Sequence, residues 1–479
     1  MHRIVFVLTL CVSLLSAGGF QSSDLLKLRS VGTVKLSPDG SRVAYTVSRN
    51  DGPRKSIGQL FVMTLADGKS ISLSASDEGS GNPEWSPDGK WIAYSGKVGD
   101  KTGLSIARPD GTEKRHLAEM SGTNAPLPTT GRTVAWSPDG KQIAYITARP
   151  GPETADATGD PIVITRYLYK PDAGEGDTRF NDNKRLHIFV VDLATGASKQ
   201  LTDGTHYEHS IEWSPDGKEI AFISNREPNE DQFFNYDLLT LNPVSGEMRR
   251  LTATENAEYR PHWSPDGKTI AYESTKRGLT DLETTMEDTH VWLIDADGKN
   301  RRELAKVDNR QGEPAWSTDG RWVYFQVQER GNIRLYRIAA DGGTAVPVIS
   351  EPGQVGSWSV RGNMIAYAFS APGDLAQLYL KTGDGPARKL TDLNRDAFAG
   401  KKVEPVEAFT FISNDNKWTV EAFLTYPANF SPDRKYPLIV NIHGGPHGQQ
   451  GPAFNFRNQV YASRGWATLM VNYRGSTGY

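Results

Sequence analysis

The sequence has 479 residues and a formal net charge of -3, from 54 basic and 57 acidic side chains. This balance gives no reason to expect a nucleic-acid partner or an anionic membrane surface. The 47 glycines, together with 11 Trp, 18 Tyr and 17 Phe, favour a β-rich globular protein with many turns.

The first 18 residues have the pattern of a secretory signal peptide. His2 and Arg3 precede an apolar run from Ile4 to Leu15, and small residues follow near Ala17. The run is too short to cross a bilayer, so we expect residues 1–18 to be removed. Cys11 is the only cysteine, so the mature chain would have no disulfide, no thiolate metal site and no cysteine nucleophile. We therefore expect a periplasmic or secreted protein with no membrane contact after cleavage.

One phrase recurs seven times along the chain, at a spacing of roughly 50 residues. The copies are LSPDGSRVAY from Leu36, WSPDGKWIAY from Trp85, WSPDGKQIAY from Trp136, WSPDGKEIAF from Trp213, WSPDGKTIAY from Trp263, WSTDGRWVYF from Trp316 and WSVRGNMIAY from Trp358. Ser-Pro-Asp-Gly is a β-turn sequence, and the apolar residues after it form a strand. Further strands and a second Asp-Gly or Thr-Gly turn complete most units.

Four short strands in each unit predict a blade of a β-propeller. Seven units predict a seven-bladed propeller over residues 19–395, and the fold class is therefore mainly β. The repeated tryptophans, from Trp85 to Trp358, are predicted to pack between blades, since repeated aromatic residues belong to the core more often than to a ligand site.

A longer interval separates the third and fourth copies, with roughly 27 extra residues around 151–186. This segment contains Arg166, Tyr167, Tyr169 and Phe180. It predicts either an elongated hairpin on the rim or a lip over a substrate cavity.

The pattern changes after Thr391, and residues 396–479 form a second part. Residues 406–426 predict a hairpin with its turn at 414–416. Residues 436–442 predict a buried strand that leads into His443-Gly444-Gly445-Pro446. Residues 456–464 predict a helix with Phe456, Val460 and Tyr461 on one side, and 467–471 predict the next buried strand. This order of elements is that of the beginning of an α/β-hydrolase sheet.

WSPDGK blades followed by KYPLIVNIHGGPHGQ and VNYRGSTGY resemble the prolyl oligopeptidase (S9) family of serine peptidases, in particular its acylaminoacyl peptidase and dipeptidyl peptidase branch. The resemblance implies that Gly444, and next to it Gly445, donate backbone N–H groups to a tetrahedral oxyanion. It implies that His443 shapes this loop and is not the general base. The alternative is a tight glycine turn after a buried strand. His447 and the loop 474–476 are expected to be structural.

The catalytic triad that the resemblance implies is absent from this sequence. Its serine would lie in a Gly-x-Ser-x-Gly turn, and no serine has that frame; the nearest, Ser105, belongs to a repeat strand, and Ser476 is one place out of frame. The closest histidine pair, His206 and His209, does not have convincing metal-ligand spacing, so neither a metal nor a cofactor is predicted. The expectation is an N-terminal portion of a longer peptidase, inactive by itself and lacking roughly 200 residues.

The predicted function is therefore that of a serine peptidase of short or N-acylated peptides, with an oligopeptide as its partner. One alternative is a TolB-like periplasmic propeller that binds proteins without catalysis. Another is a natural pseudoenzyme that ends at Tyr479. The sequence does not decide between a monomer and a homo-oligomer, or between aminopeptidase and endopeptidase action.

Overall fold

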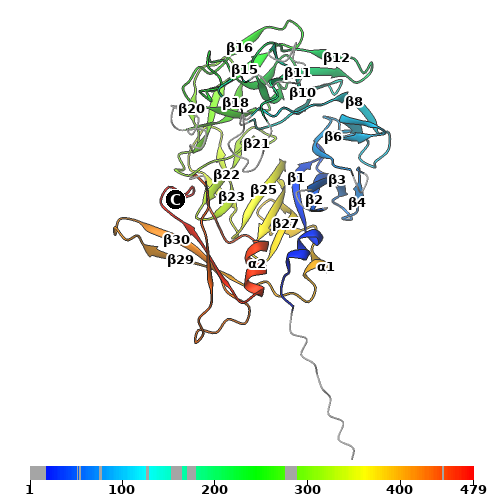
Figure 1. Cartoon of the computed structure of the whole chain (residues 1–479). Coiled ribbons are helices and arrows are strands. Elements are labelled where there is room, and N and C mark those ends of the chain that lie inside the picture. The colour runs from blue at the N-terminus through cyan, green and yellow to red at the C-terminus, as the bar shows by residue number, and fades with distance from the viewer. Residues whose placement is uncertain are drawn as a thin grey trace, which may run out of the picture.

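The computed structural model describes residues 18–50, 52, 56–74, 78–125, 129–152, 164, 166–169, 180–275, 288–444 and 447–479. The predicted signal peptide and Cys11 therefore lie outside the described residues, apart from Gly18. Within these ranges the chain is mainly β, with propeller-like sheets followed by a smaller C-terminal part (Figure 1).

The first sheets are antiparallel and each contains four strands that are consecutive in the sequence. They are β1 (Arg29–Leu36), β2 (Arg42–Asn50), β3 (Ser56–Thr64) and β4 (Ser70–Ser72); β5 (Gly81–Trp85), β6 (Ile92–Val98), β7 (Lys101–Ala107) and β8 (Arg115–Glu119); and β9 (Val134–Trp136), β10 (Gln142–Pro150), β11 (Lys184–Asp192) and β12 (Ser198–Gln200).

The next sheets repeat this pattern. They are β13 (Glu208–Trp213), β14 (Ile220–Asn225), β15 (Tyr236–Leu241) and β16 (Met248–Arg250); and β17 (Glu258–Trp263), β18 (Thr269–Thr275), β19 (Thr289–Asp295) and β20 (Arg302–Glu303). The last eight strands are β21 (Ala315–Trp316), β22 (Trp322–Glu329), β23 (Asn332–Ala339), β24 (Val346–Ile349), β25 (Gln354–Arg361), β26 (Met364–Ala371), β27 (Asp374–Thr382) and β28 (Arg388–Lys389). A single parallel pair, Ile333 with Gln354, joins these eight strands into one sheet.

The repeated turn joins the first strand of a unit to the second, as predicted. In Ser214-Pro215-Asp216-Gly217 the Ser214 hydroxyl donates to Asp216 at 2.8 Å and accepts from the Glu219 N–H at 3.0 Å. Gly217 has a φ of +72°, a conformation that favours glycine. The turn thus satisfies its own polar groups and directs the chain back into the next strand.

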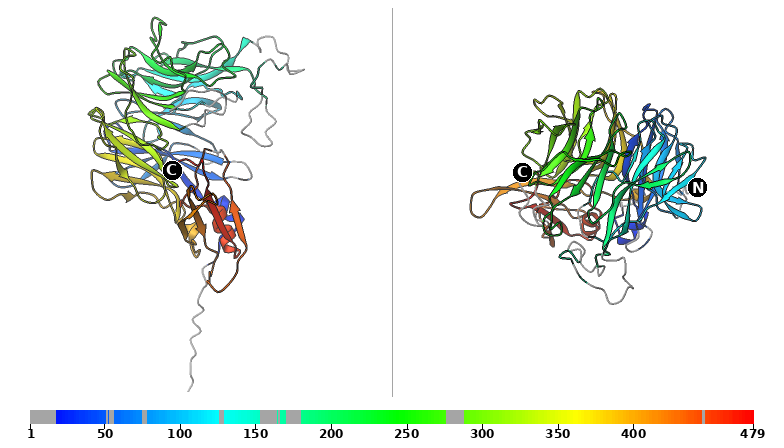
Figure 2. Two further views of the ribbon diagram at one scale, coloured as in Figure 1. Left: turned by 90° about the vertical axis from the view of Figure 1, so that its left-hand side faces the viewer. Right: turned by 90° about the horizontal axis from the view of Figure 1, so that it is seen from above.

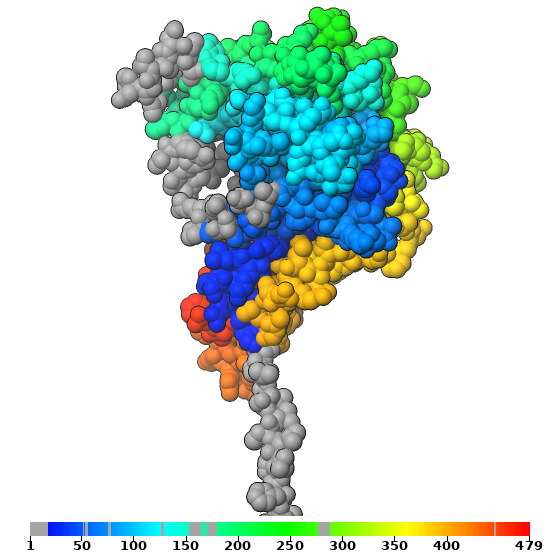
Figure 3. Space-filling model, turned by 90° about the vertical axis from the view of Figure 1, so that its right-hand side faces the viewer, coloured from blue at the N-terminus to red at the C-terminus, as the bar shows by residue number. Residues whose placement is uncertain are grey.

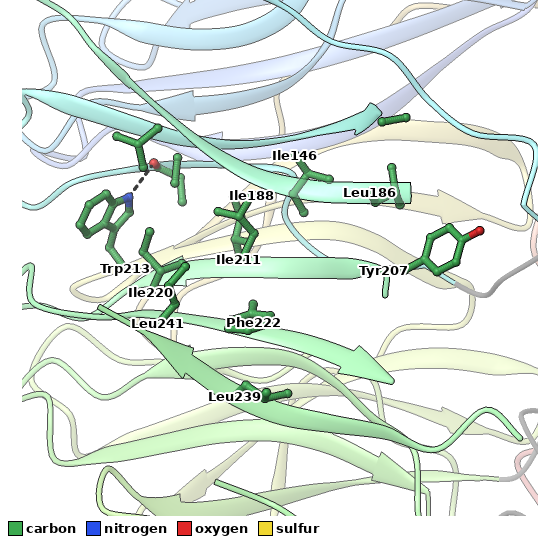
Figure 4. Close-up of a cluster of buried hydrophobic side chains, with 14 residues drawn as sticks. Ile146, Leu186, Ile188, Tyr207, Ile211, Trp213, Ile220, Phe222, Leu239 and Leu241 are labelled. Carbon is green, nitrogen blue, oxygen red and sulfur yellow. Dashed lines mark hydrogen bonds between the residues drawn. The ribbon is translucent and has the colours of Figure 1, made fainter. Parts of the chain in front are cut away.

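The repeated tryptophans lie between neighbouring sheets, which confirms their predicted packing role. Trp213 is buried among side chains of β9–β12 and β13–β16, and its indole Nε1–H donates to the Ala135 carbonyl at 3.1 Å (Figure 4). The same bond to the preceding sheet is made by Trp85, Trp136 and Trp316. Trp263 and Trp358 pack between neighbouring sheets in the same way.

The succession of sheets returns to its start. Strand β1 contacts β25, β26 and β27, and a buried apolar cluster lies between the first and last sheets. The Val34 and Leu36 N–H groups donate to the hydroxyls of Ser357 and Ser359. Figure 2 shows the sheets following one another around the molecule, with the C-terminal elements on one side of them.

The C-terminal part contains α1 (Arg395–Phe398), β29 (Val406–Ile412), β30 (Thr419–Thr425), β31 (Leu438–Asn441), α2 (Phe456–Ser463) and β32 (Ala467–Asn472). The strand order is β29-β30-β32-β31, and β31 and β32 are parallel. The predicted hairpin, strand, helix and strand are therefore present. In the turn after β29, Ser413 and Asp415 repeat the hydrogen bonds of the Ser-Pro-Asp-Gly turns.

Two details of the predicted second part are wrong. Strand β31 is not buried, since Leu438 and Val440 are exposed by 52% and 49%. It lies at the sheet edge, and the side that carries Leu438 and Val440 is open among the described residues. The buried side of α2 is formed by Asn458, Gln459 and Ala462, and not by Phe456, Val460 and Tyr461. Polar burial is tolerated because the side chains of Asn458 and Gln459 are hydrogen-bonded to Asn441 and to the Glu404 backbone.

The N-terminal segment before β1 packs against the C-terminal part. The 3₁₀-helix η1 (Ser22–Lys27) lies beside α2 (Figure 1), and Figure 3 shows this blue segment against the orange residues. Phe20 packs edge-on against Phe398, Phe454 and Phe456. Lys401 pairs with the buried Asp24 at 2.8 Å. The N-terminal end of the described chain is therefore held against α2 and the residues around Lys401.

Candidate active site

The predicted oxyanion loop begins where β31 ends. His443 and Gly444 are described, whereas Gly445 and Pro446 lie outside the described residues. The loop starts at the C-terminal end of a strand that is parallel to β32, and the loop 473–479 follows β32. Because parallel strands bring their C-terminal ends to the same edge, the two loops are neighbours.

His443 is held by the loop that follows β32. Its imidazole stacks on the Tyr473 ring with the centroids 4.5 Å apart, and the Tyr473 hydroxyl donates to the His443 carbonyl at 2.6 Å. Nε2 lies 2.9 Å from the Ser476 hydroxyl, which donates to the Tyr473 carbonyl. The two ring nitrogens therefore have partners on both loops, the Gly444 carbonyl at Nδ1 and the Ser476 hydroxyl at Nε2. His443 is tied to the loop through its ring and its backbone.

The backbone N–H of Gly444 has no acceptor in the described part of the chain. The Gly444 carbonyl lies 3.0 Å from His443 Nδ1. A Cβ placed on Gly444 would have no described atom within 4 Å. A free N–H beside open space is what an oxyanion donor requires. The assignment of Gly444 and Gly445 as donors stays a prediction, as does the shaping role of His443.

The other residues expected near the cleft have local partners. Ser476 contacts His443, as described, and Arg474 pairs with Asp415 at 3.2 Å across the hairpin turn. The Thr477 N–H donates to the Gly448 carbonyl at 2.9 Å, one residue after His447. Sequence reasoning assigned no role to Tyr473, although an aromatic residue directly after the strand next to the histidine loop was a usable signal.

A large cavity lies among the first strands of the propeller-like sheets. Its volume is about 1040 Å³, and its lining includes Lys35, Glu84, Arg132, Glu212, His262, Glu313 and Arg361. Neighbouring members form ion pairs. Lys35 lies 2.7 Å from Glu84, and Arg132 lies 3.8 Å from Glu84 and 2.9 Å from Glu212. His262 lies 3.4 Å from Glu212 and 3.0 Å from Glu313. A chain of charges thus connects consecutive sheets.

The charged side chains that line this cavity shift one another's pKa values. Burial lowers the pKa of His262, but the carboxylates of Glu212 and Glu313 raise it more, so the pKa lies above its usual value. Burial raises the pKa of Glu212, and the cations His262 and Arg132 bring it below its usual value. The pKa of Glu313 is also lowered, since burial is outweighed by its hydrogen bond to His262. We therefore expect His262 to carry a positive charge between two carboxylates at mildly acidic pH.

Sequence reasoning missed this chain of charges, although its signal was present. Lys35, Glu84, Glu212 and His262 each occupy the position before the last residue of a first strand, directly before Leu36 or a repeated tryptophan. Four titratable residues at the same position of a repeat indicate a common environment.

His206 and His209, the closest histidine pair in the sequence, contact different partners. His206 Nδ1 lies 3.3 Å from Glu230, whereas His209 is buried beside Ser210 and the Tyr236 ring. Burial lowers the pKa of His209 to about 4. Among the described residues, no group of three or more His, Asp, Glu and Cys side chains is arranged to hold a metal ion.

Part of the long interval between the third and fourth repeats is described. Strands β10 and β11 pair from Gln142–Asp192 to Pro150–Lys184, a ladder of the same length as that of β2 and β3, so the elongated hairpin stays a prediction. Arg166 is buried, and it pairs with Asp231 and with Glu230 and donates to the Tyr207 hydroxyl at 2.8 Å. The predicted lip over a cavity falls on 153–163, 165 and 170–179, outside the described residues. In the described part of the chain, no helix is long and apolar enough to span a bilayer.

Comparisons with known proteins agree on one group of enzymes. A family model for the TolB β-propeller domain (PD40) matches residues 168–288. The chain is 30% identical to the uncharacterized peptidase YuxL of Bacillus subtilis over 96% of this chain and 71% of that protein. It is 25% identical to dipeptidyl-peptidase 5 of Porphyromonas gingivalis over 95% of this chain and 68% of that protein.

A solved structure has the same fold over most of the chain. The acylaminoacyl peptidase of Pyrococcus horikoshii superposes with a TM-score of 0.75 at 21% identity, and the match covers 95% of this chain and 66% of that one. The chain therefore spans about two thirds of the length of the proteins that it matches.

Proposed function

Since the chain belongs to the prolyl oligopeptidase (S9) family of peptidases, we propose that it supplies the propeller and the oxyanion loop of a serine peptidase of short or N-acylated peptides. The observation that carries the proposal is the Gly444 N–H. It is a backbone donor without an acceptor among the described residues, beside open space, on the loop that follows β31.

We propose that the sheets from β1 to β28 form a seven-bladed propeller. Support comes from the seven copies of the repeat and from the contacts that join each sheet to the next and the last to the first. We propose that residues 396–479 are the beginning of an α/β-hydrolase domain. Its support is the order hairpin, strand, glycine loop, helix and parallel strand.

In the proposed reaction a serine attacks the acyl carbonyl of the peptide, and the carbonyl oxygen becomes negatively charged. Gly444, and Gly445 next to it, donate to this oxygen, and one such donor lowers the barrier by about 2.7–4 kcal/mol. Glycine at 444 leaves room for the carbonyl to approach. His443 holds the loop through Tyr473 and Ser476 and does not take the proton. The serine, histidine and aspartate of the triad are proposed to come from polypeptide outside this sequence, so this chain alone is expected to be inactive.

The proposed setting is the periplasm or the extracellular space, after removal of residues 1–18. The proposed partner is an oligopeptide, as the peptidase names of the relatives suggest. The TolB match at 168–288 favours one further candidate, a propeller that binds proteins without catalysis.

Hydrolysis by the protein expressed from its complete reading frame tests the proposal. We expect cleavage of N-acetyl-alanine and dipeptide p-nitroanilides. Gly444→Val is expected to lower kcat about 10²–10³-fold with an unchanged unfolding midpoint, because the new side chain meets no described atom but blocks the carbonyl. Gly122→Ala, at an exposed glycine in similarly open space far along the chain, serves as the matched control. No hydrolysis by the wild-type protein would favour the binding module, and an unchanged kcat in Gly444→Val would exclude Gly444 as the donor.

A further inference from the structure

The turn between β22 and β23 reaches from the propeller-like sheets to the segment behind the oxyanion loop. This segment is residues 448–451, which we call the rear segment. The Gln449 side-chain oxygen accepts from the Gly331 N–H at 3.0 Å, and its Nε2 donates to the Asn332 carbonyl at 3.0 Å. One side-chain amide thus satisfies a donor and an acceptor of the turn, as a neighbouring strand would.

The backbones of the turn and the rear segment are in direct contact. A Cβ on Gly451 would lie 1.7 Å from the Gly331 carbonyl oxygen, and a Cβ on Gly331 would lie 2.6 Å from the Gln450 carbonyl oxygen. Gly331 also has a φ of +74°. Since no side chain fits at either position, the two glycines bring the Gln449 amide within reach of the turn.

The rear segment is also tied to the loop that holds His443. The Gln450 N–H donates to the Asn472 side chain at 2.8 Å, and Asn472 Nδ2 donates to the Gln450 carbonyl at 2.8 Å. The Thr477 N–H donates to the Gly448 carbonyl, and the hydroxyl of Ser476 beside it lies 2.9 Å from His443 Nε2. His443 and the rear segment thus enclose Gly444 between two fixed points. The rear segment depends on the turn through Gln449, and the loop that holds His443 also contacts it, since the Arg330 N–H donates to the Gly478 carbonyl at 2.9 Å.

We propose that Gln449 is a positioning residue through which the backbone of Gly331 and Asn332 sets the place of the Gly444 donor. The contacts place the turn on one side of the rear segment and the oxyanion loop on the other. A displacement of the propeller-like sheets relative to the C-terminal sheet therefore moves the donor. This inference rests on the proposed function for its effect on catalysis, but its structural claim is independent of hydrolysis.

The same interface offers a matched control. The Arg330 side chain pairs with Glu421 on β30 at 2.9 Å and is 60% exposed. It joins the same two parts of the molecule but does not touch the oxyanion loop or the rear segment. Substitution of Arg330 therefore weakens the contact between the two parts, whereas substitution of Gln449 also affects the position of the loop.

The test compares Gln449→Ala, Gln449→Glu and Arg330→Gln by hydrogen–deuterium exchange of a peptide that covers 438–451. We expect at least tenfold faster exchange in this peptide for Gln449→Ala and no change for Arg330→Gln. Gln449→Glu keeps the acceptor for Gly331 and loses only the donor to Asn332, so an intermediate rate is expected. Unchanged exchange in Gln449→Ala, or equal increases in Gln449→Ala and Arg330→Gln, would overturn the positioning role.

Kinetics of the protein from its complete reading frame give the second readout. We expect Gln449→Ala to lower kcat about tenfold with KM within twofold, because a displaced donor affects the transition state more than the bound substrate. Arg330→Gln is expected to keep kcat within twofold. A raised KM with unchanged kcat would contradict positioning of the donor. If the wild-type protein hydrolyses nothing, the proposed function fails, and the exchange experiment alone decides the role of Gln449.

Discussion

The propeller-like sheets and the C-terminal sheet use the same local structure and differ in what covers them. Both contain four-stranded sheets, and both use a turn in which a serine and an aspartate bond each other and the returning strand. In the first part, apolar clusters lie between each sheet and the next. In the C-terminal sheet, Leu438, Val440 and Ile442 are exposed, and Ile442 reaches 76%.

This difference shows what a repeated sequence contributes. Each repeat presents the same apolar surface, so the following repeat is a suitable partner, and the last one packs on the first. The C-terminal sheet has no repeated neighbour. It obtains its described contacts from α2, which packs on β30 and β32, and from the turn between β22 and β23, where Arg330 pairs with Glu421 on β30. Equal substitutions in the two parts are therefore expected to have unequal effects.

The largest difference is expected for a pair of tryptophans. Trp213→Ala removes a side chain that is 6% exposed and a hydrogen bond to the neighbouring sheet, so a loss of about 3–5 kcal/mol in unfolding free energy is expected. Trp418→Ala, on β29–β30, removes a side chain that is 52% exposed and is expected to change the value by less than about 0.5 kcal/mol. Urea unfolding followed by circular dichroism measures both. Similar losses would show that the exposed face of the C-terminal sheet is covered in solution.

A smaller effect with a clear pH dependence is expected at His262, which connects two sheets. His262 is buried and faces Glu212 on β13 and Glu313 before β21, with Arg132 beside Glu212 and with Lys35, Glu84 and Arg361 elsewhere in the cavity lining. Its raised pKa means that its stabilisation is fully present below the unfolded pKa, about 6.5, and is lost as the pH rises through the folded value. The lowered pKa values of Glu212 and Glu313 act oppositely, because their stabilisation is lost when the pH falls through them.

His262→Gln is therefore expected to lower the unfolding free energy by about 1–3 kcal/mol at pH 6, since it leaves two carboxylates without the cation between them. The decline of stability above pH 6.5 is expected in the wild-type protein and not in the variant. Urea unfolding at pH 5.5, 6.5, 7.5 and 8.5 measures this, with His206→Gln as a control at a partly exposed histidine. An identical decline in wild type and His262→Gln would show that other groups cause it.

The parts of the fold that repeat were predictable, because the necessary information is local. Ser-Pro-Asp-Gly makes its turn from its own side chains, and Trp213 reaches the adjacent sheet as Trp85, Trp136 and Trp316 do at the same position of their repeats. The order of elements after residue 396 was predictable for the same reason. The exposure of β31 was not, because a continuous apolar run shows that a strand can be buried but not what covers it.

The buried side of α2 and the surroundings of Gly444 depend on distant residues. Apolar periodicity favoured Val460 and Tyr461, yet Gln459 is buried because the Glu404 backbone, 55 residues away in the sequence, satisfies both ends of its amide. The glycine motif pointed to Gly444. The contacts that enclose it come from Tyr473 and Ser476 and, through Gln449, from Gly331. Contacts of this kind do not recur at a regular spacing in the sequence, so a repeat or periodicity pattern does not predict them.

The smallest effect compares the same turn in the two parts. Ser214→Ala leaves the Glu219 N–H without its partner at a buried serine, and a loss of about 1–2 kcal/mol is expected. Ser413→Ala removes the equivalent bond to the Trp418 N–H, but Trp418 and its neighbours are exposed, so water replaces the serine and the loss is expected to stay below about 0.5 kcal/mol. Urea unfolding of both variants measures the difference. Equal losses would mean that the turn contributes by itself, independently of the sheet behind it. Unequal losses would mean that packing between sheets determines the contribution of each repeated turn.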